Sequence, residues 1–392
     1  MQNKFTQILS GFIFILCSCI PLLGNDSSYS GNGYHLVPLK ETDISVAKEI
    51  LSIELSDDDY INVDVYYEFF NPGSRKTITV GFESESPNNT MLFSWEGKHP
   101  FIEDFRYFLN DKELAYRTGL VYSERGDSKS YEFKALKQDA NLMEPSDPAN
   151  DSPYLTIWDS KNEMPIPFSY AYYCDITFEP GVNRVRHSYK YRKSNGVGYI
   201  FYMKYLLTPA LRWANGQIDD FTLRISVPSS AKHFVIKADA FPDSDFYVTR
   251  GFGKTRKVQL SKQEEYYEVS LRNGSLEWHS KNYKPTSELE VHSADYVAGY
   301  MGEIEEKYYS GILYDRTILY PIDVSRMTQK QKRLLRNAAF ANRGYMFKNK
   351  ELQEYFDNIW WYMPDPLWHG TIDDFTTQEQ ALIKEILESE NR

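Results

Sequence analysis

Apolar and polar side chains alternate through most of the first three quarters of this 392-residue chain. In the clearest segment, residues 61–69, Ile, Val, Val, Tyr and Phe alternate with Asn, Asp, Tyr and Glu. Successive side chains of a strand point to opposite faces of a sheet, so a period of two predicts a strand with one buried face. The pattern recurs at residues 78–82, 185–191, 221–227 and 267–271. Because turn residues rather than helices separate these segments, the region from about residue 34 to 290 predicts a mainly β fold, built as an antiparallel β-sandwich.

A polar loop divides this β region. Asn, Asp, Ser and Pro crowd residues 137–166, a composition typical of connecting loops. We therefore expect two sandwich lobes, at residues 25–150 and 151–290, followed by a connector at 291–312.

The hydrophobic period changes near residue 326, where helical spacing begins. The first predicted helix begins at a capping box of Thr328 and Gln331 and ends at Gly344, which suits the left-handed position after a helix. A second short helix should hold Leu352, Tyr355 and Phe356, and a third should begin at Thr376 with Glu379 as its reciprocal cap. The predicted core residues are Leu334, Leu335, Ala338, Ala341, Leu352, Tyr355, Phe356, Leu382, Ile383, Ile386 and Leu387. Residues 313–392 thus predict a small all-α domain.

The first residues carry the features of an export signal. Lys4 precedes an apolar run from Ile8 to Leu23, which is shorter than the ~20 residues that a membrane-spanning helix needs. We interpret residues 1–24 as a secretory signal peptide, with cleavage after Gly24. The alternative is lipidation at Cys19, because residues 16–19 resemble a bacterial lipobox.

Export would leave Cys174 as the one cysteine of the mature chain, since the other two of the three lie before residue 24. A single thiol forms no internal disulfide. Cys174 falls on the apolar side of the alternation at residues 172–178, which predicts a small buried side chain rather than a nucleophile.

Several motifs of the tail resemble the YARHG domain, a small module of bacterial envelope proteins. They are the segments Leu334–Asn337, Phe340–Tyr345 with Phe347, Leu352–Phe356 and Trp361–Tyr362. The motif that names the family differs here, because Phe340 stands for its tyrosine, Asn342 for its arginine and Arg343 for its histidine. The resemblance implies an exported protein and brings no established activity.

The strand-rich region is similar to a bacterial family known as domain of unknown function 4424. The similarity rests on Asn25-Asp26-Ser27, Val65–Phe69 before Asn71, His99-Pro100 before Asp104-Phe105, Pro180-Gly181 before His187, and Leu206–Thr208 before Trp213. This resemblance also implies an exported protein, and its first motif agrees with cleavage after Gly24.

Charge and motif content exclude several classes of function. The 55 acidic and 44 basic residues give a net charge of −11, which argues against a general nucleic-acid binder. The seven histidines show no metal-ligand spacing, and the chain contains no nucleophile elbow, phosphate loop or dinucleotide-binding glycine pattern. We therefore expect no catalytic residue, metal site or cofactor.

The strongest local charge signal lies in the tail. Residues 326–350 hold eight basic residues and no acid, whereas residues 351–392 hold ten acids against two bases. We favour pairing between these two halves within the tail; a basic face for phosphate- or carboxylate-bearing envelope polymers is the alternative. The candidate binding residues are Arg336, Asn337, Arg343, Tyr345, Trp360, Trp361 and Tyr362. Core packing or scaffolding is the competing role for the aromatic and polar members of this set.

These observations predict an exported bacterial cell-envelope protein, in the periplasm or at the cell surface, with a non-enzymatic binding or adaptor role. The YARHG-like tail is the expected contact module, and its expected partner is a cell-wall polymer or another envelope protein. Contact with the membrane would come only through a lipid on Cys19. The alternatives are a carbohydrate-binding or carbohydrate-active surface protein, suggested by the tyrosine-rich strands, and a structural subunit of an envelope assembly.

Overall fold

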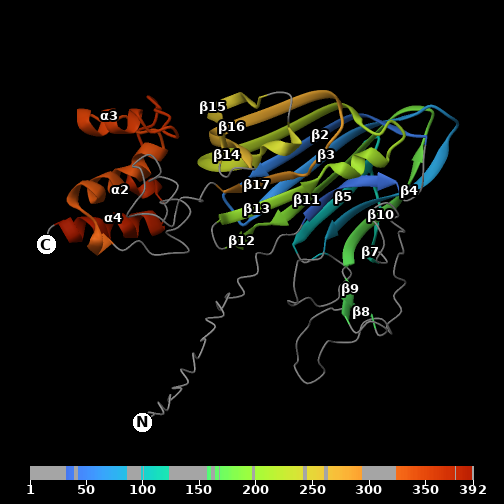
Figure 1. The fold of residues 1–392 in the computed structure, drawn as a ribbon, viewed down its shortest axis with the longest axis horizontal. Coiled ribbons are helices and arrows are strands. Elements are labelled where there is room, and N and C mark those ends of the chain that lie inside the picture. Colours follow the sequence, from blue (N-terminus) through green and yellow to red (C-terminus); the bar gives the residue numbers. More distant parts are fainter. Residues whose placement is uncertain are drawn as a thin grey trace, which may run out of the picture.

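The computed structural model describes residues 32–38, 43–85, 99, 101–122, 157–159, 164–166, 168–196, 199–241, 245–259, 264–293, 324–375 and 377–390. The described chain is mostly β-sheet up to residue 293 and carries three α-helices after residue 324, which confirms the predicted fold class (Figure 1). Cys19, Gly24 and Thr376 lie outside the described residues. No helix of the described part has both the length and the apolar character needed to cross a membrane.

The strands form where the sequence alternates. In β3 (Tyr60–Asn71), every second side chain from Ile61 to Phe69 is buried, as the period of two predicts. The other strands are β1 (Asn32–Pro38), β2 (Ser45–Leu55), β4 (Lys76–Glu85), β5 (Ile102–Leu109), β6 (Lys112–Leu114), β7 (Arg117–Tyr122), β8 (Ile157–Asp159), β9 (Met164–Ile166), β10 (Phe168–Phe178), β11 (Gly181–Arg192), β12 (Ser194–Gly196), β13 (Tyr199–Leu206), β14 (Ile218–Lys237), β15 (Tyr247–Gln259), β16 (Glu265–Tyr283) and β17 (Leu289–Ser293). The strand β17 extends three residues into the segment predicted as a connector.

Among the described residues, fifteen of these strands belong to one sheet, and β8 pairs with β9 separately. The main path runs β6-β5-β11-β3-β2-β14-β17-β13-β1-β4-β10-β7, with β16 beside β14, β15 beside β16, and β12 beside β13. Most neighbours are antiparallel, but β2 pairs with β14 and β1 with β13 in parallel. Strands from the two sides of residue 150 alternate along this path, so the segments predicted as two lobes share one sheet.

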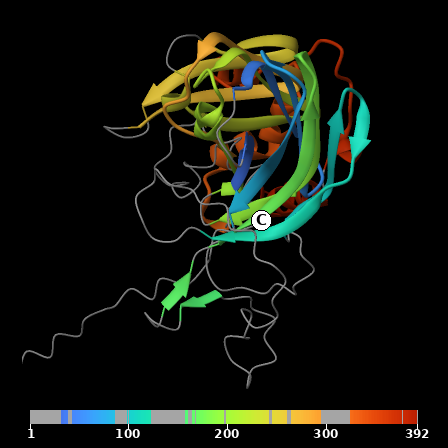
Figure 2. The same cartoon turned by 90° about the vertical axis from the view of Figure 1, so that its right-hand side faces the viewer.

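The sheet curves so that strands far apart in this order face each other across the core (Figure 2). The ring of Phe82 on β4 lies 5.2 Å from that of His187 and 5.0 Å from that of Tyr189 on β11. Phe105 on β5 stacks on Tyr172 on β10 at 4.4 Å. The sandwich is therefore formed by one sheet packing on itself.

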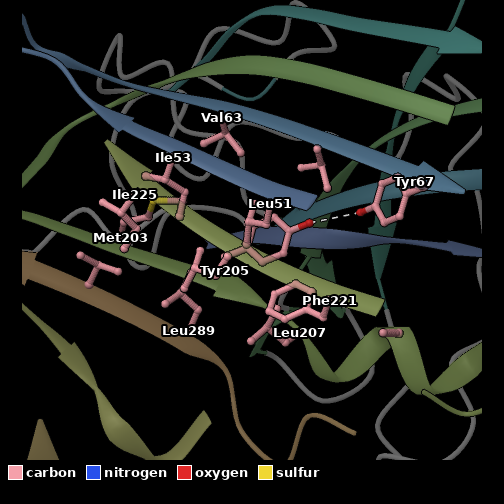
Figure 3. Close-up of a cluster of buried hydrophobic side chains, with 14 of the residues drawn as sticks. Leu51, Ile53, Val63, Tyr67, Met203, Tyr205, Leu207, Phe221, Ile225 and Leu289 are labelled. Atoms are coloured by element: carbon pink, nitrogen blue, oxygen red, sulfur yellow. Dashed lines mark hydrogen bonds between the residues drawn. The ribbon is translucent and has the colours of Figure 1, made fainter. Parts of the chain in front are cut away.

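Tyrosine and aliphatic side chains fill the interior (Figure 3). The hydroxyl groups of Tyr67 and Tyr205, both fully buried, lie 3.3 Å apart, within hydrogen-bond distance. Cys174 is 3% exposed, and its burial raises the pKa of the thiol to about 12. The prediction that Cys174 is a small buried side chain is confirmed.

The tail folds as three helices, α2 (Gln329–Asn342), α3 (Lys350–Asp357) and α4 (Thr377–Glu390), which we call the helical domain together with the segments that join them. The predicted capping box is present: the Thr328 side chain accepts from the backbone N–H of Gln331, and the Gln331 side chain accepts from that of Thr328. Gly344 has a φ of +85°, and the N–H groups of Gly344 and Tyr345 donate to the carbonyls of Ala341 and Phe340. This pattern is a Schellman motif, so the predicted end of α2 is confirmed.

One predicted core position of the helical domain is wrong. Leu387 is 42% exposed, whereas Leu382, Ile383 and Ile386 are buried as expected. The apolar face of α4 is thus narrower than the sequence indicates.

Candidate functional site

Three strands carry a group of polar side chains on the face that turns away from the sandwich core. In β14 and β16, Phe234, Val269 and Leu271 point into the core, so the alternating residues point outward. The register places His233 opposite Ser270, Ser270 opposite Lys254, and Glu268 opposite Arg256. We call the outward residues His233, Lys254, Arg256, Ser270 and Arg272 the docking face.

The helical domain lies against the docking face, beside β14, β15 and β16 (Figure 1). The contact is made chiefly by Trp360, Trp361 and Tyr362, which follow α3 and which we call the aromatic loop. Lys254 Nζ donates to the carbonyl of Tyr362 at 2.9 Å and to that of Trp360 at 3.4 Å. Ser270 Oγ donates to the carbonyl of Trp361 at 3.3 Å. The sheet therefore binds the loop through its backbone.

Aromatic and amide groups extend this contact. The guanidinium of Arg256 lies 4.5 Å from the centre of the Trp360 ring, in a cation–π arrangement, and is held by Glu268 at 2.6 Å. The His233 ring packs edge-to-face on Trp361 at 5.9 Å. His233 Nε2 also lies 2.7 Å from Asn342 Oδ1, at the end of α2.

Arg272 is the most enclosed charged residue of the docking face. Its side chain is 8% exposed, and the nearest acidic group, the carboxylate of Asp365, lies 3.7 Å away. Burial lowers the pKa of Arg272. Burial also lowers the pKa of Lys254. Gly344 is required here, because a Cβ at this position would clash with Arg272 and would lie 2.7 Å from the Met363 carbonyl oxygen.

The basic and acidic halves of the tail meet in ion pairs. Arg343 forms a bidentate pair with Glu379, at 3.0 and 2.8 Å, and its guanidinium lies 4.2 Å from the Phe375 ring. Arg336 pairs with Glu390 and Arg333 with Glu351. Both arginines among the candidate binding residues, Arg336 and Arg343, are thus held by carboxylates of the same domain.

The other predicted site residues are also engaged within the chain. Asn337 donates to the Arg333 carbonyl at 2.7 Å, one turn earlier in α2. The hydroxyl of Tyr362 donates to the Tyr345 carbonyl at 2.8 Å. Trp361 and Tyr362 belong to the core of the helical domain, and Trp360 is partly buried against it.

The structure thus brings three of the seven candidates, Trp360, Trp361 and Tyr362, together at the junction with the sheet, and it places the four others elsewhere in the helical domain. The docking face itself is not among the residues predicted from the sequence. A signal for it exists in β15, where Lys254 and Arg256 alternate with Thr255 and therefore share one face. Within the described residues, no group of three or more His, Cys, Asp or Glu side chains is arranged to hold a metal ion.

The comparisons with solved structures give low structural similarity. A candidate nutrient binding protein from Legionella pneumophila is 17% identical, with a TM-score of 0.48, over 92% of this chain and 98% of that one. The M1 zinc metallopeptidase of Deinococcus radiodurans is 10% identical, with a TM-score of 0.24, over 65% of this chain and 43% of that one. No curated protein sequence matches the chain.

The family comparison concerns the tail. The similarity of the strand-rich region to the domain of unknown function 4424 stays a prediction. Residues 308–391, which include all three described helices, match the YARHG domain, in agreement with the motifs of the tail.

Proposed function

We propose that the chain is an exported bacterial cell-envelope protein with a non-enzymatic binding or adaptor role, and that its helical domain contacts the partner. The match to the YARHG domain over residues 308–391 supports export, because this domain is typical of secreted proteins. The apolar run at residues 8–23 supports the same localisation.

The contact role is supported by an ordered turn in which an apolar side chain is exposed to solvent. Leu367 is 84% exposed, although its N–H is fixed by the Asp365 carboxylate at 2.9 Å. The next residue, Trp368, packs on Tyr345 at 5.9 Å and anchors the turn to the helical domain. A rigidly held, protruding apolar residue loses little conformational entropy on binding, which suits a protein contact.

The test compares two exposed apolar positions in a chain of residues 25–392. We expect a photo-crosslinker at Leu367 to capture an envelope component in cells, and Leu367→Asp to reduce recovery of that component at least tenfold. Val182 is the matched control, since it is 56% exposed and lies on β11, outside the helical domain. Equal crosslinking from the two positions, or none from Leu367, would contradict the proposal.

The same preparation distinguishes the alternative functions. A carbohydrate role was suggested by the strand tyrosines, but Tyr67, Tyr107 and Tyr205 are fully buried in the sandwich. Sedimentation of the chain with protein-free cell-wall sacculi would favour a polymer as the partner. Recovery of the chain in a stable complex of fixed stoichiometry would instead favour a structural subunit.

A further inference from the structure

The docking face binds the aromatic loop mostly through groups that every peptide possesses. Lys254 and Ser270 donate to three successive backbone carbonyls, those of Trp360, Trp361 and Tyr362. Such bonds do not depend on the side chains of the bound segment. A segment of another protein could therefore form the same bonds.

Arg272 is the part of the docking face that the helical domain satisfies least. Its Nη1 and Nη2 atoms are buried and have no hydrogen-bond partner in the described part of the chain. The Asp365 carboxylate, at 3.7 Å, lies beyond hydrogen-bond distance. The buried Nδ2 of Asn342, in the same junction, also lacks an acceptor among the described residues. Buried donors without acceptors raise the free energy of the docked arrangement, since water would satisfy them after release.

The two parts of the chain can separate without opening either core. The core of the sheet and the core of the helical domain share no residue within the described ranges. Trp361 packs on Phe356 at 6.0 Å, and Tyr362 donates to the Tyr345 carbonyl, so the aromatic loop stays anchored in the helical domain after release. A junction made of hydrogen bonds to backbone carbonyls and a few ring contacts, between separate cores, favours relative movement of the two parts.

We propose that the docking face is a binding site for an acidic, aromatic segment of a partner protein, and that the helical domain is a releasable cover on this site. A partner carboxylate against Arg272 would form the bidentate pair that Asp365 does not reach. An aromatic side chain would take the place of Trp360 over Arg256. This site lies on the sheet and is additional to the contact proposed for Leu367.

The first measurement follows release of the cover in a chain of residues 25–392. Phenylglyoxal modifies accessible arginines, and mass spectrometry reports the rate at Arg272, with the 70% exposed Arg75 as internal reference. We expect slow modification in the wild-type chain and at least tenfold faster modification in Asp365→Asn, which keeps an oxygen for the turn but removes the charge. Asp373→Ala, an exposed acid of the same domain, is the matched control and should leave the rate unchanged.

The second measurement detects the binding site. A fluorescent peptide of residues 358–367 serves as the acidic aromatic probe, and its version with Asp365→Asn serves as the neutral probe. We expect the acidic probe to bind the Asp365→Asn chain at least tenfold more tightly than the wild-type chain, and to protect Arg272 again. Adding Lys254→Ala to that chain should weaken binding at least tenfold.

Three results would overturn the inference. Unchanged modification of Arg272 in both Asp365→Asn and a second opening variant, Trp360→Ala, would show that the cover is not releasable. Faster modification without binding of either probe would show that the exposed face is not a peptide site. Equal binding of the acidic and neutral probes would contradict the proposal that Arg272 selects an acidic partner segment. Thermal unfolding of each variant checks that the fold is retained.

Discussion

At the residue scale, the pair of Arg343 and Glu379 has the clearest energetic consequence. The Glu379 side chain is 3% exposed and that of Arg343 is 17% exposed, and two hydrogen bonds join them. We expect Arg343→Ala to destabilise the helical domain by about 3 kcal/mol, because it leaves a buried carboxylate without its charge partner. Urea unfolding monitored by tryptophan fluorescence measures this, since three of the seven tryptophans lie in the helical domain.

A second substitution separates the charge effect from the loss of packing on Phe375. In the Arg343→Ala background, Glu379→Gln removes the negative charge of the buried Glu379 side chain and should recover part of the lost stability. Arg75→Ala is the control, because Arg75 and Glu179 form an exposed pair, 70% and 56% accessible, which should contribute little. If Arg343→Ala costs no more than Arg75→Ala, the pair does not stabilise the domain.

At the scale of a single element, the start of α2 depends on one hydroxyl. Thr328 Oγ1 accepts from the backbone N–H of Gln331 at 3.2 Å. An N–H in the first turn of a helix has no backbone carbonyl of the same helix to bond, so the hydroxyl supplies the acceptor. We expect Thr328→Ala to destabilise the helical domain by about 1 kcal/mol. Thr328→Ser keeps the hydroxyl and should stay within a few tenths of a kcal/mol of the wild type. The same urea unfolding measures both, and equal stabilities of the Ala and Ser variants would contradict the role of the cap.

Elements of this kind could be predicted from the sequence because their causes are local. The alternation in β3, the capping box at Thr328 and the glycine at residue 344 each act within a few residues, and the structure confirms all three. Leu387 was wrongly assigned to the core because helical spacing shows which side of α4 is apolar but not how wide a surface packs against that side.

The docking face could not be predicted for a different reason. Period two shows that Lys254 and Arg256 share a face of β15, but it does not show what covers that face. The contact joins strands before residue 284 to the aromatic loop beyond residue 359, and no local pattern encodes a contact over that separation. The aromatic loop was recognised from its composition, whereas its partner on the sheet was not.

At the scale of the whole molecule, the order of strands determines which parts of the chain can fold alone. The strand β11, from the second half, lies between β3 and β5, from the first half, and its residues Gly181–Arg192 pair with Tyr60–Asn71. The strand β2 also depends on β14 across the same division. Each half alone would expose unpaired strand edges and half of a shared core.

This arrangement predicts the behaviour of a chain cut between the halves. With a protease site inserted after Asp151, we expect fragments 25–151 and 152–392 to elute together in native buffer and to separate only in denaturant. Expressed singly, neither fragment should show cooperative unfolding. A cut after residue 312 is the contrasting case, because the docking contacts then join two parts whose cores share no residue in the described chain, and high salt should weaken the charged part of these contacts and release the helical domain. Two folded, independently stable fragments after the cut at Asp151 would instead support two separate sandwich lobes and would contradict the shared sheet.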